Sequence, residues 1–378
     1  YEDWRGLAPG QQQEKGSELL RLDKALGFKL SQPPLLRVLL VRLGEDSFHV
    51  VWSNHHLILD GWCRPLIISE VLTCYDAFTH GQTPSLEPAR QFRDYVAWLK
   101  EQDLSSAEAF WREELKGFTS PVTLSEYASS GVSGDYREST CEVSVETTMA
   151  LGALARRHQL TLHTLVQGAW ALLVGRYTGS DDVLFGVTVS GRPADLAGNE
   201  QIVGLFINTL PVRVRLLHDT SLLSWLKNLQ AHQAEMREYE YAPLAQIHSW
   251  SEVPRRLQLF ESIFVFNNHP SASSFKEQGR SLELNAFHSV NWSNVYANYP
   301  LILVISPGTQ LTIRMIYDSR RFDAGRITQQ LADFREILEE ITANAERMLI
   351  DFLSIRCDVV PAGHFRDEAE HDDFNFEL

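Results

Sequence analysis

The chain has 378 residues, of which 44% are hydrophobic and 22% are charged, and this length suits two lobes of ordinary domain size. Its formal net charge of -15 argues against a nucleic-acid partner, because phosphate binding requires a basic surface. The four cysteines are far apart, the start lacks a signal-peptide pattern, and no apolar run approaches the ~20 residues of a membrane span. We therefore expect reduced thiols, no membrane contact and a cytoplasmic location.

The first third of the chain shows both helical and strand periodicity. Helices are predicted over residues 17–28, 65–78, 91–100 and 107–116, and strands over residues 35–43 and 47–56. The two strands flank a turn at Gly44, and Pro33-Pro34 ends the first helix. Residues 119–134 carry Ser, Gly and Pro without periodicity, which predicts a linker.

A second compact region follows the linker. Strands are predicted over residues 139–145, 183–190, 204–214, 262–266, 282–284, 301–305 and 311–317. Helices are predicted over residues 148–158, 161–177, 222–239, 244–250 and 324–348, with Thr161 as an N-cap. Strands and helices mix without regular βαβ alternation, which predicts an α+β fold class. We place an N-terminal lobe at 1–125, a C-terminal lobe at 126–355 and an acidic tail at 356–378.

Residues 55–61 read HHLILDG, an HHxxxDG string at the expected end of a strand. A histidine that titrates near neutral pH beside a carboxylate and a glycine is a common arrangement for acyl transfer. Neighbouring strand residues point to opposite faces, so His55 and His56 can hardly bind one metal ion together. The same alternation places His56 with Trp52 and Asn54 as the working histidine, whereas His55 packs on the other side.

Two further residues of the string have structural alternatives. Asp60 is either a second catalytic group or a structural carboxylate paired with an arginine, and Gly61 permits a turn or a close backbone approach. The chain contains no GxSxG elbow, no Walker loop and no GxGxxG fingerprint. Without a nucleophile, we expect direct transfer between two substrates, in which proximity and orientation supply most of the acceleration.

Five ordered segments resemble the condensation domains of nonribosomal peptide synthetases. Residues 55–61 match the HHxxxDG signature of the family, and residues 92–98 (FRDYVAW) resemble its YxDYAxW motif. Residues 203–213 match a GxFxNTxxxR segment, residues 241–244 lie where the family has a Pro-centred motif, and residues 266–270 resemble an FxNxP region. Five matches in order are far more specific than one heptapeptide.

The resemblance implies an α+β fold of two lobes like chloramphenicol acetyltransferase, arranged as a V-shaped pseudo-dimer. Family members normally begin with a further strand and helix, so the first lobe is expected to lack its N-terminal segment. The implied reaction of this antibiotic and secondary-metabolite family is amide formation, by attack of an acceptor aminoacyl-carrier amine on a donor peptidyl or aminoacyl thioester. Donor and acceptor peptidyl carrier proteins would present these substrates on phosphopantetheine, next to an adenylation domain, with no directly bound cofactor or metal.

The resemblance also implies a role for individual residues. His56 would be a general base or would position the amine at the meeting point of a tunnel. Asp60 would then be structural, with Arg192 of the SGRP loop as its ion-pair partner, and His55 and Gly61 would support the site. The residues implied for the substrate tunnel are Trp62, Ser190, Asn208 and Thr209.

The subtype and the activity of the chain stay open. Residues 56–63, 190–193 and 204–213 resemble domains that follow epimerization domains and take a D-configured donor and an L-configured acceptor. Cyclization relatives have Asp in place of the first histidine, which this chain does not. Competing hypotheses are an epimerization-type relative, a catalytically impaired fragment, a carrier-docking module of the same fold and a free-standing acyltransferase.

Overall fold

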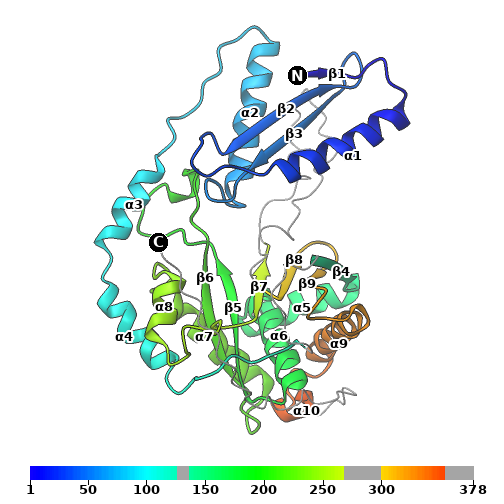
Figure 1. Cartoon of the computed structure of the whole chain (residues 1–378). Helices are drawn as coiled ribbons and strands as arrows, with labels where there is room; N and C mark the ends of the chain where they lie inside the picture. The colour runs from blue at the N-terminus through cyan, green and yellow to red at the C-terminus, as the bar shows by residue number, and fades with distance from the viewer. Residues whose placement is uncertain (126–135, 268–298, 354–378) are drawn as a thin grey trace, which may run out of the picture. The chain divides into compact units, whose positions relative to one another are not determined.

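The computed structural model describes residues 1–125, 136–267 and 299–353, and these form two compact units (Figure 1). Of the described residues, unit 1 contains Tyr1–Asp103 and Val189–Asn208, and unit 2 contains the rest. The lobes predicted from the sequence are continuous stretches, whereas both units are discontinuous. The predicted acidic tail and the predicted strand over 282–284 lie outside the described residues.

Unit 1 is built on a small sheet with the strand order β1-β2-β3. β1 (Glu2–Asp3) runs parallel to β2 (Leu36–Arg42), which pairs antiparallel with β3 (Phe48–Asn54). The backbone N–H of Leu43 donates to the carbonyl of Ser47 at 2.8 Å and closes the predicted turn. The unit also contains α1 (Pro9–Leu26), α2 (Cys63–Thr79), α3 (Phe92–Glu101) and the short 3-10 helix η1 (Asn199–Gln201).

The start of α1 differs from the sequence prediction. The leucine pattern predicts a start at Ser17, whereas the helix begins at Pro9. Proline suits a first helical position, and the Gln11 side chain accepts a hydrogen bond of 3.1 Å from the backbone N–H of Ala8. Periodicity detects only an apolar stripe, and the first turns of α1 have none, so these turns were missed.

Unit 2 contains, among the described residues, a six-stranded sheet with the order β4-β9-β8-β7-β5-β6. Its strands are β4 (Tyr136–Glu142), β5 (Asp182–Val189), β6 (Asn208–Arg215), β7 (Ser262–Phe266), β8 (Leu301–Ser306) and β9 (Thr312–Asp318). β5, β7 and β8 are parallel neighbours, and β9 pairs antiparallel with both β8 and β4. Together with the helices, the two sheets confirm the predicted α+β class.

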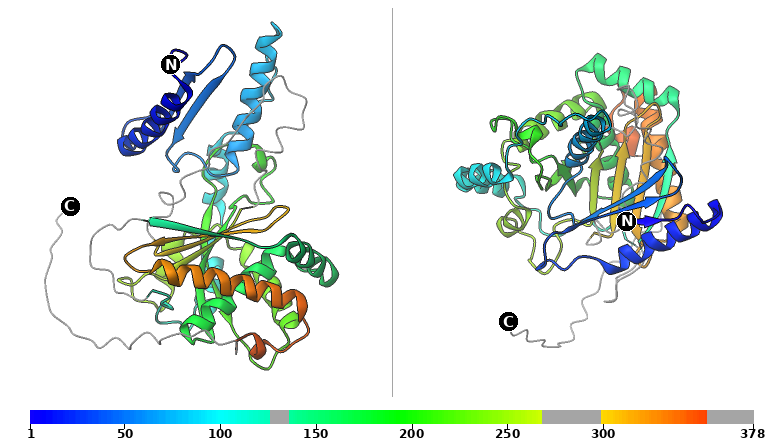
Figure 2. Two further views of the ribbon diagram at one scale, coloured as in Figure 1. Left: turned by 90° about the vertical axis from the view of Figure 1, so that its right-hand side faces the viewer. Right: turned by 90° about the horizontal axis from the view of Figure 1, so that it is seen from above.

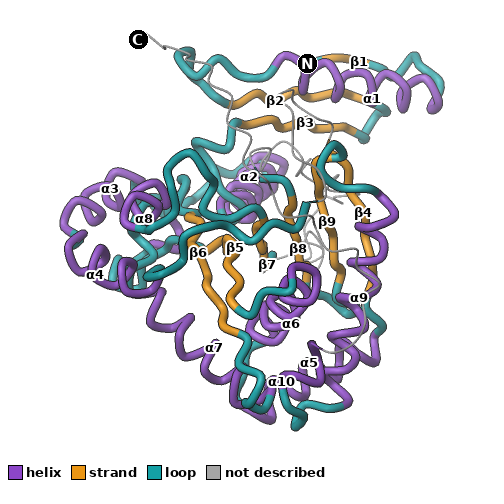
Figure 3. Tube along the Cα trace, turned by 60° about the horizontal axis from the view of Figure 1, so that its bottom comes forward, coloured by secondary structure: helices purple, strands orange, loops and turns teal. Residues whose placement is uncertain are grey.

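Helices α5 (Val145–His158), α6 (Leu162–Thr178) and α9 (Ala324–Ala343) lie along one face of this sheet (Figures 2 and 3). Most residues of α6 are buried, and the Thr161 hydroxyl caps it by accepting from the Thr164 N–H at 3.0 Å, as predicted. The other helices of unit 2 are α4 (Leu104–Glu114), α7 (Leu222–Arg237), α8 (Leu244–Trp250) and α10 (Leu349–Leu353). The single helix predicted over 324–348 is wrong at its end, because α9 stops at Ala343. None of the helices among the described residues combines the length and apolar character that a membrane crossing requires.

Arg213, near the end of β6, forms an ion pair and hydrogen bonds at the C-terminus of α4. Its guanidinium contacts the Asp182 carboxylate at 2.6 Å and donates to the carbonyls of Glu114 (3.0 Å) and Lys116 (2.8 Å). The last carbonyls of a helix lack partners within the helix, and the buried arginine satisfies that of Glu114, the last residue of α4, and that of Lys116 in the turn that follows. Asp182 raises the pKa of Arg213, which keeps the cation charged.

His163, at the start of α6, makes unit 2 sensitive to acid. Its ring lies against Phe264 and Phe266, with centroid distances of 5.5 and 5.2 Å. Burial, with a smaller contribution from Arg237, lowers the pKa of His163 to about 4. Because the unfolded chain takes up this proton near pH 6.5, stability is expected to fall between pH 6.5 and pH 4, by up to about 3 kcal/mol.

Urea unfolding at several pH values tests this expectation with the variant His163→Asn, which is polar but does not titrate. The slope of stability against pH should be shallower in the variant than in the wild type between pH 6.5 and pH 4. The hydrogen bond with Glu114 raises the pKa of His232, which also contributes to the pH dependence of stability. Both proteins contain His232, so its contribution cancels in the comparison. Equal slopes for the two proteins would contradict the assignment to His163.

Candidate active site

The two histidines of the HHxxxDG string lie just beyond the end of β3. The predicted strand over 47–56 is wrong at this end, because β3 stops at Asn54 and residues 56–58 form a turn. Strand alternation therefore cannot assign His56 to the face of Trp52 and Asn54. The backbone N–H of His55 still donates to the Leu35 carbonyl at 2.9 Å, which is where pairing with the neighbouring segment ends.

The structure gives the two histidines different surroundings. The Nδ1 atom of His55 accepts a hydrogen bond of 3.1 Å from the Leu57 N–H, and its ring meets Phe28 edge-on at 6.2 Å. The His55 carbonyl accepts from the Ile58 N–H at 3.2 Å, so His55 holds the turn from both its side chain and its backbone. His56 begins that turn and is half-buried. His55 is thus packed as a support, and His56 is the candidate for chemistry.

Asp60 is buried, with only 2% of its surface exposed. Its Oδ1 atom accepts hydrogen bonds from the backbone N–H groups of Trp62 (3.0 Å) and Cys63 (3.3 Å), which lie at the start of α2. Its Oδ2 atom accepts from the backbone N–H of Phe206 at 3.1 Å. Asp60 therefore joins two parts of unit 1 that are far apart in the sequence.

Arg192 lies beside this carboxylate, as the resemblance implied. Its Nη2 atom is 3.5 Å from Oδ1 of Asp60, and the two side chains are 5% and 0% exposed. Its Nη1 atom donates to the carbonyls of Asn199 and of Ile202, the latter at 3.0 Å, and its guanidinium lies 4.0 Å from the centre of the Phe206 ring. One guanidinium thus contacts both the buried Asp60 carboxylate and the segment that contains Asn199 and Ile202.

Cys63 completes the contact between the string and the distant segment. It is the first residue of α2 and is fully buried. Its Sγ atom lies 3.2 Å from Asp60 Oδ1, 3.1 Å from the Gly204 carbonyl oxygen and 3.2 Å from the Gly204 nitrogen. Burial raises the pKa of this thiol, so it stays protonated near neutral pH.

The motif over residues 92–98 supports the same segment from α3. Phe92, Tyr95 and Trp98 lie on α3, and Tyr95 is buried with Leu196, Ile202 and Phe206 in one apolar cluster. The Phe206 ring is 4.3 Å from Tyr95 and 5.3 Å from Phe92, and Trp98 Nε1 donates to Asp195 at 3.0 Å. The predicted motifs at 55–61 and 92–98 therefore meet the SGRP loop and the first residues of the 203–213 segment inside unit 1.

Glycines allow this close packing. Gly191 has a positive φ of 62°, and a Cβ atom there would lie 1.9 Å from the Phe206 carbonyl oxygen. We expect Gly191→Ala to destabilise unit 1 by about 2–3 kcal/mol, because it combines left-handed strain with a backbone clash. Chemical denaturation of the variant measures this loss.

Gly198 is the matched control for this prediction. It also has a positive φ, of 73°, but a Cβ atom there would meet only Arg90 Cδ, at 3.8 Å. Gly198→Ala should therefore cost only about 1 kcal/mol, which is the strain of the left-handed backbone alone. Equal losses at the two positions would show that the contact of residue 191 with Phe206 does not matter.

The remaining predicted site residues are placed less specifically. Gly61 is buried, and Trp62 and Ser190 are half-buried. The Ser190 hydroxyl oxygen accepts from the Arg192 N–H at 3.5 Å. Asn208 belongs to unit 1 and Thr209 to unit 2. Their role in a substrate tunnel stays a prediction, and residues 268–270 of the FxNxP region lie outside the described residues.

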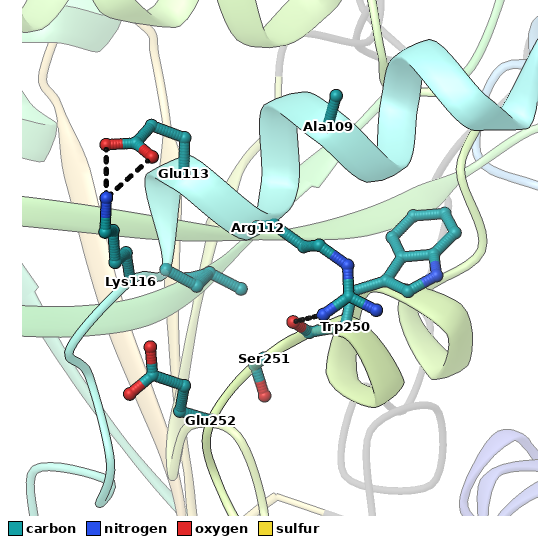
Figure 4. Close-up of a pocket in the computed structure, with 8 residues that line it drawn as sticks. Ala109, Arg112, Glu113, Lys116, Trp250, Ser251 and Glu252 are labelled. Atoms are coloured by element: carbon teal, nitrogen blue, oxygen red, sulfur yellow. Dashed lines mark hydrogen bonds and ion pairs between the residues drawn. The ribbon is translucent and has the colours of Figure 1, made fainter.

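A pocket of about 360 Å³ lies elsewhere, in unit 2 (Figure 4). It is lined by α4, its following turn and the end of α8, and Arg112 Nη1 there donates to the Trp250 carbonyl at 3.3 Å. None of the predicted site residues lines it. Over the part of the chain that the structure describes, no cluster of three His, Cys, Asp or Glu residues is arranged to hold a metal ion.

Sequence reasoning missed Cys63 and the backbone of residues 204–207. The apolar run over 204–214 predicts one strand, but only its part from Asn208 onward joins the sheet as β6. The backbone of Gly204 bonds to Cys63 instead, and that of Phe206 bonds to Asp60. The glycine at the start of this run was the available signal of a close backbone approach.

Comparisons with known sequences all indicate one family. The family model described as Condensation domain matches residues 1–354. The chain is 42% identical over 353 residues to a linear gramicidin synthase of Brevibacillus parabrevis, which is 92% of this chain and 4% of that protein. It is 33% identical over 354 residues to bacitracin synthase 3 of Bacillus licheniformis, which is 93% of this chain and 6% of that protein. The chain thus spans a small part of the length of these relatives.

Comparisons with solved structures establish the fold. A four-domain nonribosomal peptide synthetase bound to AMP and glycine matches with a TM-score of 0.74 at 17% identity, over 92% of this chain and 27% of that one. The starter condensation domain of rhizomide synthetase matches with a TM-score of 0.72 at 20% identity, over 94% of this chain and 79% of that one. These matches confirm the predicted chloramphenicol acetyltransferase-like fold.

Proposed function

The chain belongs to the condensation-domain family, and on that premise we propose that it forms amide bonds between two carrier-bound substrates. The amine of an acceptor aminoacyl thioester attacks the carbonyl carbon of a donor thioester. The observation that carries this proposal is the anchoring of the HHxxxDG turn, with a half-buried His56 four residues before the buried Asp60–Arg192 pair. Such an arrangement can hold one histidine in place beside two reacting groups.

The proposed step needs no covalent enzyme intermediate. A C–N bond forms, the C–S bond of the donor thioester breaks, and the amine loses one proton. His56 accepts that proton or orients the amine, and the proton is finally taken up by the departing phosphopantetheine thiolate. Asp60 and Arg192 act on the turn and do not touch the reacting atoms in this scheme.

The partners follow from the proposed reaction. Donor and acceptor carrier proteins would supply phosphopantetheine-bound thioesters, and an adenylation domain would load the acceptor carrier. Trp62, Ser190, Asn208 and Thr209 would line the substrate tunnel. The chain itself would need no resident cofactor. We also propose a cytoplasmic location, which is supported by the free thiols of the three cysteines within the described residues, Cys63, Cys74 and Cys141.

A test of this function uses two purified carrier proteins, one loaded with an acyl group and the other with an amino acid. Mixing them with the chain should yield a peptide on the acceptor carrier, detected by mass spectrometry of the intact carrier. Donors loaded with D- and L-residues should react at different rates if the proposed D-donor subtype is correct. Carrier binding without any product would instead indicate a docking module, and a change in the configuration of one substrate would indicate an epimerase.

A further inference from the structure

We propose that Cys63 is a positioning residue of the proposed reaction, because its thiol fastens the HHxxxDG turn to the backbone of Gly204. The inference rests on the proposed function and adds a residue to it. Cys63 touches no reacting group in this scheme. It acts through Asp60, whose place fixes the turn that carries His56.

The contacts of the thiol carry the argument. Sγ of Cys63 can accept a hydrogen bond from the Gly204 N–H at 3.2 Å. Its single proton can be donated either to the Gly204 carbonyl at 3.1 Å or to Asp60 Oδ1 at 3.2 Å. One atom therefore contacts both polar groups of Gly204 and the carboxylate of the HHxxxDG string, across a separation of 141 residues.

Besides Gly204 and Asp60, the thiol has one further polar contact among the described residues, with Nη2 of Arg192 at 3.9 Å. Cys63 and Asp60 are buried, and a Cβ atom at Gly204 would lie 2.1 Å from Cδ2 of Phe92. The backbone at Gly204 is thus pressed between α3 and the start of α2, where water would replace the thiol only with difficulty. Buried backbone groups without a partner cost free energy, so loss of the thiol should loosen this contact. The raised pKa of the thiol is consistent with this role, since a thiolate could not donate.

Cys63 is connected to His56 through Asp60 and the short turn before it, which is held by hydrogen bonds. Asp60 receives hydrogen bonds from the first residues of α2 and from Phe206, so it has a defined place relative to both. The intervening residues are held by the contacts of Leu57 and Ile58 with His55. A displacement of Asp60 would therefore be passed to His56, and small displacements of reacting groups lower rates strongly.

The test compares Cys63→Ser, Cys63→Ala and Cys74→Ala in the complete chain. Serine keeps a donor and an acceptor at position 63, alanine keeps neither, and Cys74 is a half-buried cysteine on the same helix. We expect Cys63→Ala to lower kcat for amide formation by about tenfold or more with little change in KM for either carrier. Cys63→Ser should restore the rate to within about threefold of wild type, and Cys74→Ala should match wild type.

Hydrogen–deuterium exchange gives a second readout that does not depend on activity. The amides of Gly204 and Phe206 should exchange about tenfold faster in Cys63→Ala than in the wild type or in Cys63→Ser. An unchanged kcat in Cys63→Ala would overturn the proposal, even with faster exchange, because the thiol would then be only structural. Equal losses in the serine and alanine variants would overturn its hydrogen-bonding basis. If the wild type makes no product, the proposed function fails, and unchanged exchange in Cys63→Ala separately overturns the fastening of Gly204 by Cys63.

Discussion

Replacing His56 with alanine is expected to lower the rate of amide formation by about 10²–10⁴-fold, the usual contribution of a positioned acid–base group. The variant loses the imidazole that accepts the amine proton or orients the amine. Because His56 is half-buried at the start of a turn, its removal leaves no buried partner unsatisfied among the contacts described above. The expected change is therefore in kcat, with the free energy of unfolding nearly unchanged. Single-turnover assays with both carriers loaded measure the rate directly.

His55→Ala is the matched control, because it removes the neighbouring imidazole from the same string. This variant loses the edge contact with Phe28 and the acceptor for the Leu57 N–H. It should lose stability, by about 1–2 kcal/mol, and part of its rate through disorder in the turn. A rate for His56→Ala equal to that of wild type would contradict the assignment of His56, and a larger rate loss in His55→Ala would reverse the roles of the two histidines.

Local signals in the sequence predicted most of the elements correctly. Alternating apolar residues located β2 and β3, and the apolar stripe of α6 together with Thr161 located that helix and its cap. The predicted ends of helices and strands were wrong where the local residue pattern and the backbone hydrogen bonding differ. The apolar–polar alternation continues through His56, but the pairing of β3 ends at Asn54. Strand alternation therefore gave a wrong reason for choosing His56 over His55 as the working histidine.

The assembly of the site could not be predicted from periodicity. Asp60 and Phe206 are 146 residues apart, and nothing in their local patterns indicates that the carboxylate of one accepts from the backbone of the other. The resemblance to a known family did identify Arg192 as the neighbour of Asp60, because the family carries long-range information that a single sequence lacks. It gave no role to Cys63, whose importance depends on a backbone contact with Gly204. Gly204 takes part in this contact only through backbone atoms, so its place depends on the path of the chain and is not visible in a side-chain pattern.

Replacing Arg192 with methionine is expected to destabilise unit 1 by about 3–5 kcal/mol, the usual cost of removing one partner of a buried ion pair. Methionine fills a similar volume, but it leaves the Asp60 carboxylate, whose side chain is 0% exposed, without its counter-charge. It also leaves the carbonyls of Asn199 and Ile202 without the donor that holds their loop. Denaturant unfolding and the exchange of the amides of residues 199–206 measure the two consequences separately.

The double variant Asp60→Asn/Arg192→Met separates the charge from the packing. Asparagine removes the negative charge and keeps an acceptor for the N–H groups of Trp62 and Cys63, but its amide nitrogen cannot accept from the Phe206 N–H, so only part of the stability should return. The two side chains are in direct contact, so their effects should be non-additive by about 1–3 kcal/mol. Additive losses would show that Arg192 acts only through its contacts with the loop. If the double variant folds but the rate of amide formation stays low, the charge pair is needed to hold His56 as well as to stabilise the fold.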